Sequence, residues 1–101
     1  MPMLMVRYEV AEENAAEVAA AIDEVFAAVR ERQPEGVRYA YLRAVHGTEF
    51  VALLELPEGV ENPLPGIEAA RRLQEVVARC AVGPAPVPRP LDVLGDHRLF
   101  G

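Results

Sequence analysis

Several residue types that carry enzyme chemistry are absent from this chain. Its 101 residues include no tryptophan, no lysine and no serine, and its one cysteine is Cys80. Without serine there is no serine-nucleophile triad, and without lysine there is no Schiff base with a carbonyl substrate or with pyridoxal phosphate. A lone cysteine permits neither an internal disulfide nor a multi-cysteine metal site. These routes to covalent catalysis are therefore closed.

Motifs for phosphates, metals and membranes are missing as well. The sequence has no glycine-rich phosphate loop, no CxxC and no HExxH, and its histidines, His46 and His97, have no evident carboxylate partners for a metal site. No apolar run approaches the roughly 18 residues of a membrane span. The start, MPMLMVRYEV, lacks the basic region of a signal peptide. We therefore expect no metal, no cofactor, no membrane association and a cytoplasmic location.

The charge and composition of the chain describe one acidic globular domain. Ten arginines face sixteen acidic residues, for a formal net charge of −6, so no basic stripe is available to neutralise phosphates and nucleic acid is not an expected partner. Hydrophobic residues make up 51% of the chain and charged residues 26%, which is typical of a folded protein. The length predicts a single domain over residues 1–101.

The chain is organised around residues 37–56, VRYAYLRAVHGTEFVALLEL, which read as two strands joined at His46 and Gly47. A two-residue hairpin loop needs positive φ, which glycine takes freely and histidine tolerates better than most residues. This loop pairs residue 45 with residue 48. The sequence therefore predicts one β-hairpin with a defined register.

That register decides which side chains share a face of the sheet. It sets Arg38 opposite Glu55 on one face, where opposite charges support the pairing. It puts the aromatic side chains of Tyr39, Tyr41 and Phe50 on the other face, together with Arg43. Both faces are largely apolar, so each needs a cover. We expect helices on one face and a second subunit on the other.

Segments on both sides of the hairpin complete the fold. The side chains of residues 3–10 alternate between two faces, one of them more apolar, and predict a strand. Residues 14–33 repeat apolar side chains at helical spacing and predict a helix capped by Asn14. Residues 66–81 predict a second helix, with Cys80 as a small core residue in its apolar stripe. Alternating prolines make 84–90 a stiff connector before a last strand over 91–100, with a bulge at Gly95. This order of strand, helix, hairpin, helix and strand predicts a ferredoxin-like βαββαβ domain of the α+β class. Its sheet is antiparallel, and both helices lie on one face.

Candidate site residues follow from this arrangement. Tyr8 of the first strand joins Tyr39, Tyr41 and Phe50 to stack on a flat aromatic ligand, while Arg43 holds an anionic oxygen. His97, in the last strand, is the candidate general base. The alternatives are that the tyrosines pack a solid core, that Arg43 extends into water from the hairpin tip, and that His97 is an exposed or packing residue. We expect Arg7, Arg38 and Glu55 to form charge pairs on the dimer side, with Arg7 near Glu55.

Four stretches carry a resemblance to a known group of proteins: MVRYEV at 5–10, GVRYAYLRAVHGTEFVALLEL at 36–56, NPL at 62–64 and GDHRLFG at 95–101. With the order of elements, they make the chain similar to the dimeric α+β barrel superfamily, and most to small bacterial proteins related to antibiotic biosynthesis monooxygenase (ABM) domains. The resemblance implies two sheets packed face to face across a two-fold axis, with any small-molecule pocket between sheet and helices. Asn14 and Asn62 are expected at a helix start and in a loop, outside such a pocket.

Two functional hypotheses remain, because no motif names a reaction. The first is a homodimeric, cofactor-independent monooxygenase-like protein that acts on or binds a small aromatic or quinone-like compound, with Tyr8, Tyr39, Tyr41, Arg43 and Phe50 as ligand contacts and His97 as base. The second is a non-catalytic dimer that binds a small ligand or serves as an accessory protein. A cavity between sheet and helices that holds Arg43 and His97 would favour the enzyme, and a solid core there would favour the non-catalytic dimer.

Overall fold

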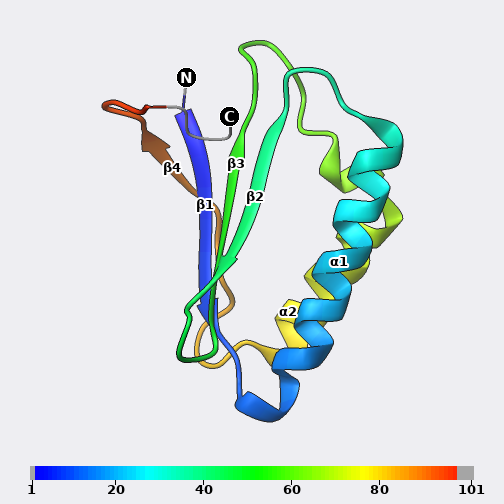
Figure 1. The fold of residues 1–101 in the computed structure, drawn as a ribbon, viewed down its shortest axis with the longest axis vertical. Coiled ribbons are helices and arrows are strands. Elements are labelled where there is room, and N and C mark those ends of the chain that lie inside the picture. Colours follow the sequence, from blue (N-terminus) through cyan, green and yellow to red (C-terminus); the bar gives the residue numbers. More distant parts are fainter. Residues whose placement is uncertain (1, 98–101) are drawn as a thin grey trace.

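Two helices lie on one face of a four-stranded antiparallel sheet in a computed structural model, which describes residues 2–97 (Figure 1). The strand order is β2-β3-β1-β4, so β1 and β3 occupy the centre. The elements are β1 (Pro2–Glu9), the 3-10 turn η1 (Glu12–Asn14), α1 (Ala15–Arg32), β2 (Arg38–Arg43), β3 (Glu49–Glu55), the 3-10 turn η2 (Leu64–Gly66), α2 (Glu68–Cys80) and β4 (Arg89–Asp92). The ferredoxin-like α+β fold expected from the sequence is confirmed.

The hairpin register is the one that the sequence predicts. Tyr39 lies opposite Leu54, and Tyr41 opposite Ala52, while Arg38 faces Glu55 with 3.7 Å between Arg38 Nε and Glu55 Oε1. The conformation expected of the loop is wrong in one respect. His46 does not take positive φ; residues 45–48 form a wider bend in which Gly47, at φ 147°, makes the unusual turn. The glycine therefore absorbs the strain by itself.

The helices begin and end close to their expected positions, although not by the expected capping. The Asn14 side chain makes no cap hydrogen bond, because η1 already gives Asn14 a near-helical backbone at φ −102° and ψ −6°, whereas a side-chain cap needs an extended residue. At the other end Gln33 turns into the left-handed region at φ 46°, just before Pro34. In α2 the helix proper starts at Glu68, since Gly66 belongs to η2.

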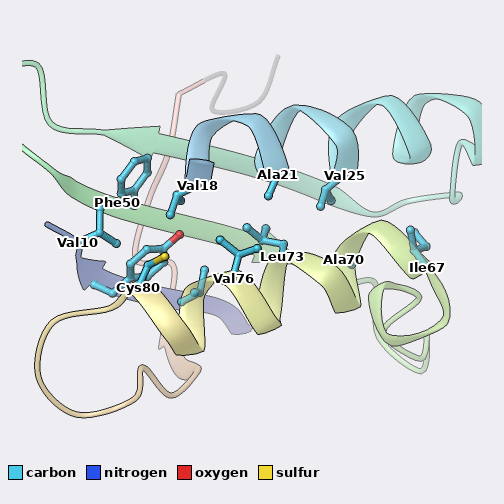
Figure 2. Close-up of a cluster of buried hydrophobic side chains, with 12 residues drawn as sticks. Val10, Val18, Ala21, Val25, Phe50, Ile67, Ala70, Leu73, Val76 and Cys80 are labelled. Carbon is cyan, nitrogen blue, oxygen red and sulfur yellow. The ribbon is translucent and has the colours of Figure 1, made fainter. Parts of the chain in front are cut away.

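The core lies between the helices and the sheet, as Figure 2 shows. Val18 and Val25 of α1 are completely buried, and Phe50 of β3 is 2% exposed. Burying side chains of this size contributes on the order of 2 kcal/mol each. Surface ion pairs join the two helices outside this core, with Arg79 Nη2 2.6 Å from Glu17 Oε2 and Arg72 bound to Glu24. Cys80 is buried, as its place in the α2 stripe predicts.

The last strand is much shorter than expected. β4 spans Arg89–Asp92 and pairs with β1, with Asp92 opposite Pro2, the first residue of β1. Among the described residues β4 does not continue beyond Asp92, so Gly95 makes no bulge and His97 lies in an irregular, exposed segment. The expected strand position of His97 is therefore wrong. Phe100 lies outside the described residues.

The face of the sheet opposite the helices is not covered by any helix of the described residues (Figure 1). It carries a group of apolar side chains, of which Leu42 is 49% exposed: Met5, Ala40, Leu42, Val51 and Leu53. The expected contact of Arg7 with Glu55 is wrong, because the register sets Arg7 opposite Val51 and its guanidinium pairs with Glu49. Between residues 2 and 97, no helix has the length and apolar character to cross a membrane.

Candidate functional site

A cavity of about 320 Å³ lies between the sheet and α2. Its sheet wall comes from β1, β2 and β3, and the opposite wall from the inner side of α2. The segment around η2 and the proline-rich segment 85–88 contribute the rest of the lining, and the cavity is open to solvent on one side. This volume is at the lower end of the range of small-molecule sites, and most of the lining is apolar.

Small side chains account for the open space on the α2 side. Ala52 stands at the centre of β3, with Val6 and Tyr41 as its cross-strand partners, and Ala70 of α2 lines the same cavity. Against α1, by contrast, the fully buried Val18 and Val25 belong to the packed core. Because alanine carries only a methyl group, Ala52 and Ala70 leave room between the sheet and α2.

Three tyrosines form the polar part of the sheet wall. The hydroxyl oxygens of Tyr8 and Tyr41 lie 2.5 Å apart, and their rings meet edge to face at a centroid distance of 6.4 Å. The Tyr39 ring stacks on Phe26 of α1 at 4.9 Å. All three rings line the cavity. Each is held by aromatic neighbours, so their hydroxyl groups have defined positions.

Burial keeps these hydroxyl groups protonated. Desolvation raises the pKa of Tyr39 to about 12. It also raises the pKa of Tyr41, with the Tyr8 hydrogen bond adding to the effect, and it raises the pKa of Tyr8 against the opposing effect of the same hydrogen bond. At neutral pH the site therefore presents neutral hydroxyl groups. These can donate hydrogen bonds to a carbonyl or phenolic oxygen, but they are poor bases.

The structure brings together three of the six candidate residues. Tyr8, Tyr39 and Tyr41 line the cavity, whereas Phe50 lies in the core, where it stacks on Tyr8 at a centroid distance of 5.6 Å. The other two candidates are elsewhere.

Arg43 and His97 do not line the cavity. Arg43 is exposed at the end of β2, in a separate shallow depression beside Asp23 of α1. The alternation of β2 correctly sets it on the helix-side face, but its side chain is exposed beside α1 and does not reach the cavity under α2. His97 is exposed beyond the end of β4 and is not part of the lining. The cavity between the sheet and α2 therefore lacks both groups that were expected of the enzyme.

Sequence reasoning missed the polar residues of the cavity mouth, which is the part of the lining where the side chains are exposed or half-buried. Arg71 and Gln74 of α2 line it, as does Asn62, which was expected to lie outside any pocket. Asn62 is in the loop before η2, and that loop forms part of the lining. The available signal was in α2, where Arg71 and Gln74 follow directly after Ala70 and Leu73 of the apolar stripe and share a helix face with each other at a spacing of three.

Metal-binding chemistry has no support in the described part of the chain. Residues 2–97 contain no group of three or more His, Cys, Asp or Glu side chains placed to hold an ion. The cavity lining offers tyrosine hydroxyl groups, two amides and one guanidinium. What this set can do is bind oxygen atoms of a mostly apolar molecule.

Comparison with solved structures agrees with this architecture. A structure described as an antibiotic biosynthesis monooxygenase matches at 16% identity with a TM-score of 0.69, covering 94% of this chain and all of that one. The Mycobacterium tuberculosis protein Rv0793 matches at 17% identity with a TM-score of 0.71, covering 95% and 98%. A dimeric ferredoxin-like protein of unknown function from Jannaschia sp. CCS1 matches at 11% identity and 0.60, covering 91% and 98%.

These likenesses define the class of the protein. It is a ferredoxin-like α+β domain, with a small-molecule-sized cavity between sheet and helices. More particularly, it has the fold of ABM structures, so the resemblance stated from the sequence is confirmed at the level of fold. No protein-family model and no curated protein matched the sequence.

Proposed function

We propose that this protein binds a small, flat aromatic or quinone-like molecule in the cavity between the sheet and α2. The observation that carries the proposal is the paired hydroxyl groups of Tyr8 and Tyr41 in a mostly apolar cavity of about 320 Å³. Apolar walls favour a ring system, and neutral hydroxyl donors favour a ring that bears oxygen. A structure of the same fold is described as an antibiotic biosynthesis monooxygenase, which is compatible with a small-molecule ligand.

We propose further that the protein acts as a homodimer through the sheet face opposite the helices. Leu42, Val51 and Leu53 form the centre of this face, and the Arg7–Glu49 and Arg38–Glu55 pairs lie on either side. An apolar centre with a charged rim is typical of a protein interface. The dimeric Jannaschia protein of the same fold supports this assembly.

The chemistry that fits this cavity is monooxygenase-like and needs no cofactor. An anthrone-type ring that loses a proton becomes an electron-rich anion. The Tyr8–Tyr41 pair stabilises its oxygen through the one hydroxyl proton that is not used within the pair. The anion reduces molecular oxygen. One oxygen atom replaces two hydrogens as a new carbonyl, and the other leaves as water. In this proposal the tyrosines donate hydrogen bonds, and His97 has no role because it is exposed outside the cavity.

A second candidate, binding without turnover, is favoured by one observation. The described lining contains no Asp, Glu or His, and its tyrosines have raised pKa values, so none of these residues is a ready base at neutral pH. A substrate that is acidic enough to ionise in water would not need one. Whether the protein turns over its ligand or only binds it is therefore decided by measuring binding and oxygen uptake separately.

The test of binding is calorimetric titration with 1-naphthol and with anthrone. The variant Ala70→Leu places a larger side chain in the cavity and should weaken binding by about tenfold or more, whereas Ala27→Leu, on the exposed side of α1, should leave it unchanged. Wild-type protein that binds neither compound would contradict the proposed function.

The test of turnover is oxygen uptake with anthrone and a panel of hydroquinones. Uptake above the uncatalysed rate, reduced in Tyr41→Phe, is expected for the monooxygenase-like reaction. Binding without uptake by any member of the panel would favour the non-catalytic candidate.

A further inference from the structure

The cavity mouth has a charge opposite to that of the protein as a whole. The chain carries sixteen acidic residues and ten arginines, yet the lining of the cavity includes no Asp or Glu among the described residues and one arginine, Arg71. Gln74, one turn along α2, and Asn62 stand with it. The one formal charge at this site is therefore positive.

Arg71 is fixed toward the mouth but keeps most of its donors. Its Nη1 donates to the Pro65 carbonyl oxygen of η2 at 2.8 Å. A guanidinium has five N–H donors, so others remain for a ligand. Among the described residues Arg71 has no carboxylate partner, whereas its neighbour Arg72 is paired with Glu24 and Glu68 on the outer surface. Two consecutive arginines thus face different surroundings.

Asn62 is oriented by the backbone so that it presents donors too. Its Oδ1 accepts a hydrogen bond from the Leu64 N–H at 3.0 Å. With the oxygen engaged in this way, the amide NH₂ is the end that remains to contact a ligand. The mouth therefore offers a guanidinium and an amide donor, and the Tyr8 and Tyr41 hydroxyl groups lie on the sheet wall.

We infer that the ligand is an aromatic carboxylate, whose ring system fills the apolar cavity and whose carboxylate binds Arg71. This inference rests on the proposed function, and it names the class of compound. A guanidinium recognises a carboxylate with two parallel hydrogen bonds, which gives both affinity and orientation. Arg71 then holds the acid group at the mouth, and the ring is directed toward the tyrosines.

The experiment compares 2-naphthoate with 2-naphthalenemethanol, its neutral counterpart of similar shape, by calorimetric titration. Wild-type protein should bind the acid about tenfold more tightly than the alcohol, which corresponds to one strong charge-assisted contact. In Arg71→Gln this preference should disappear while the affinity for the alcohol is retained. Arg72→Gln, one residue along the chain and outside the cavity, should keep the preference, and Arg71→Lys should keep part of it.

The outcomes separate this inference from the proposed function. Equal affinity for acid and alcohol in wild-type protein would overturn the role of Arg71 and leave the cavity a binding site. Equal loss of the preference in Arg71→Gln and Arg72→Gln would also overturn it, because the effect would then be general charge attraction. Absence of binding of either compound would overturn the cavity as a site for aromatic molecules, and this inference with it.

Discussion

The hydroxyl groups of Tyr8 and Tyr41 meet at 2.5 Å although their strands are not neighbours, since β3 lies between β1 and β2. The contact crosses β3 between Ala52, which lies directly opposite Tyr41 in the register, and Phe50, which lies opposite Tyr8. A larger residue at position 52 would separate the two rings. One alanine therefore allows both the cavity and the tyrosine pair that marks its sheet wall.

The tyrosine pair should show energetic coupling. Tyr8→Phe and Tyr41→Phe should each lower the free energy of unfolding by about 1 kcal/mol, because each leaves a half-buried hydroxyl without its partner. The double variant should cost less than the sum, since no hydroxyl is then left unpaired. Urea denaturation of the four proteins measures this. Tyr39→Phe is the control, because its hydroxyl makes no hydrogen bond within residues 2–97. Additive costs would contradict the pairing.

Stability should fall at alkaline pH as the tyrosines ionise. The folded protein retains these protons above pH 10, whereas the unfolded chain releases them near its ordinary pKa of 10, and Tyr39 has its pKa raised to about 12. The free energy of unfolding should therefore be independent of these groups below about pH 10. It should then drop by up to about 1.4 kcal/mol per pH unit for each tyrosine as the pH rises through 12.

This dependence can be followed by tyrosinate absorbance together with urea denaturation. The chain has three tyrosines, and all three pack in or against the hydrophobic core. The tyrosinate absorbance therefore reports only on Tyr8, Tyr39 and Tyr41. Titration of all three near pH 10 in protein that remains folded would contradict their burial.

The proposed dimer should depend on the uncovered sheet face. Leu53→Glu places a charge at the centre of that face and, by two-fold symmetry, a second one close to it, so the protein should become monomeric or aggregate. The matched control is Leu94→Glu, because Leu94 is 98% exposed and lies outside the sheet. Light scattering coupled to size exclusion measures the mass. A dimer that survives Leu53→Glu unchanged would show that this face is not the interface.

Two glycines should differ in how much they tolerate a methyl group. Gly36 and Gly59 have similar backbone angles, at φ 75° and 78°, so alanine costs about 1 kcal/mol of left-handed strain at either position. At Gly36 the added carbon would also lie 2.6 Å from Pro57 Cγ, while Gly59 has open space around it. We expect Gly36→Ala to lose clearly more stability in urea denaturation. Equal losses would mean that the packing of Pro57 against Gly36 contributes nothing.

The strands, the helices and the hairpin register could be predicted because they depend on local patterns. Alternation put Tyr39 and Tyr41 on the covered face, and apolar spacing put Cys80 in the core. The capping of Asn14 and the backbone of His46 were predicted wrongly, since a 3-10 turn and a wider bend supplied alternatives that residue type does not reveal. The role of Ala52 could not be predicted, because an alanine in a strand shows no sign of the space beside it.

The order of apolar and polar residues determined that this chain forms a ferredoxin-like domain with tyrosines under its helices, because periodicity is a property of neighbouring residues. Only the tertiary structure decided where a cavity remains and which groups line it. Asn62, Arg71 and Pro86 come from separate segments, and they meet because α2 and the segments beside it pack against one part of the sheet. Arg43 and His97 are excluded by tertiary position as well: Arg43 lies beside α1 in a separate depression, and His97 lies beyond the end of β4.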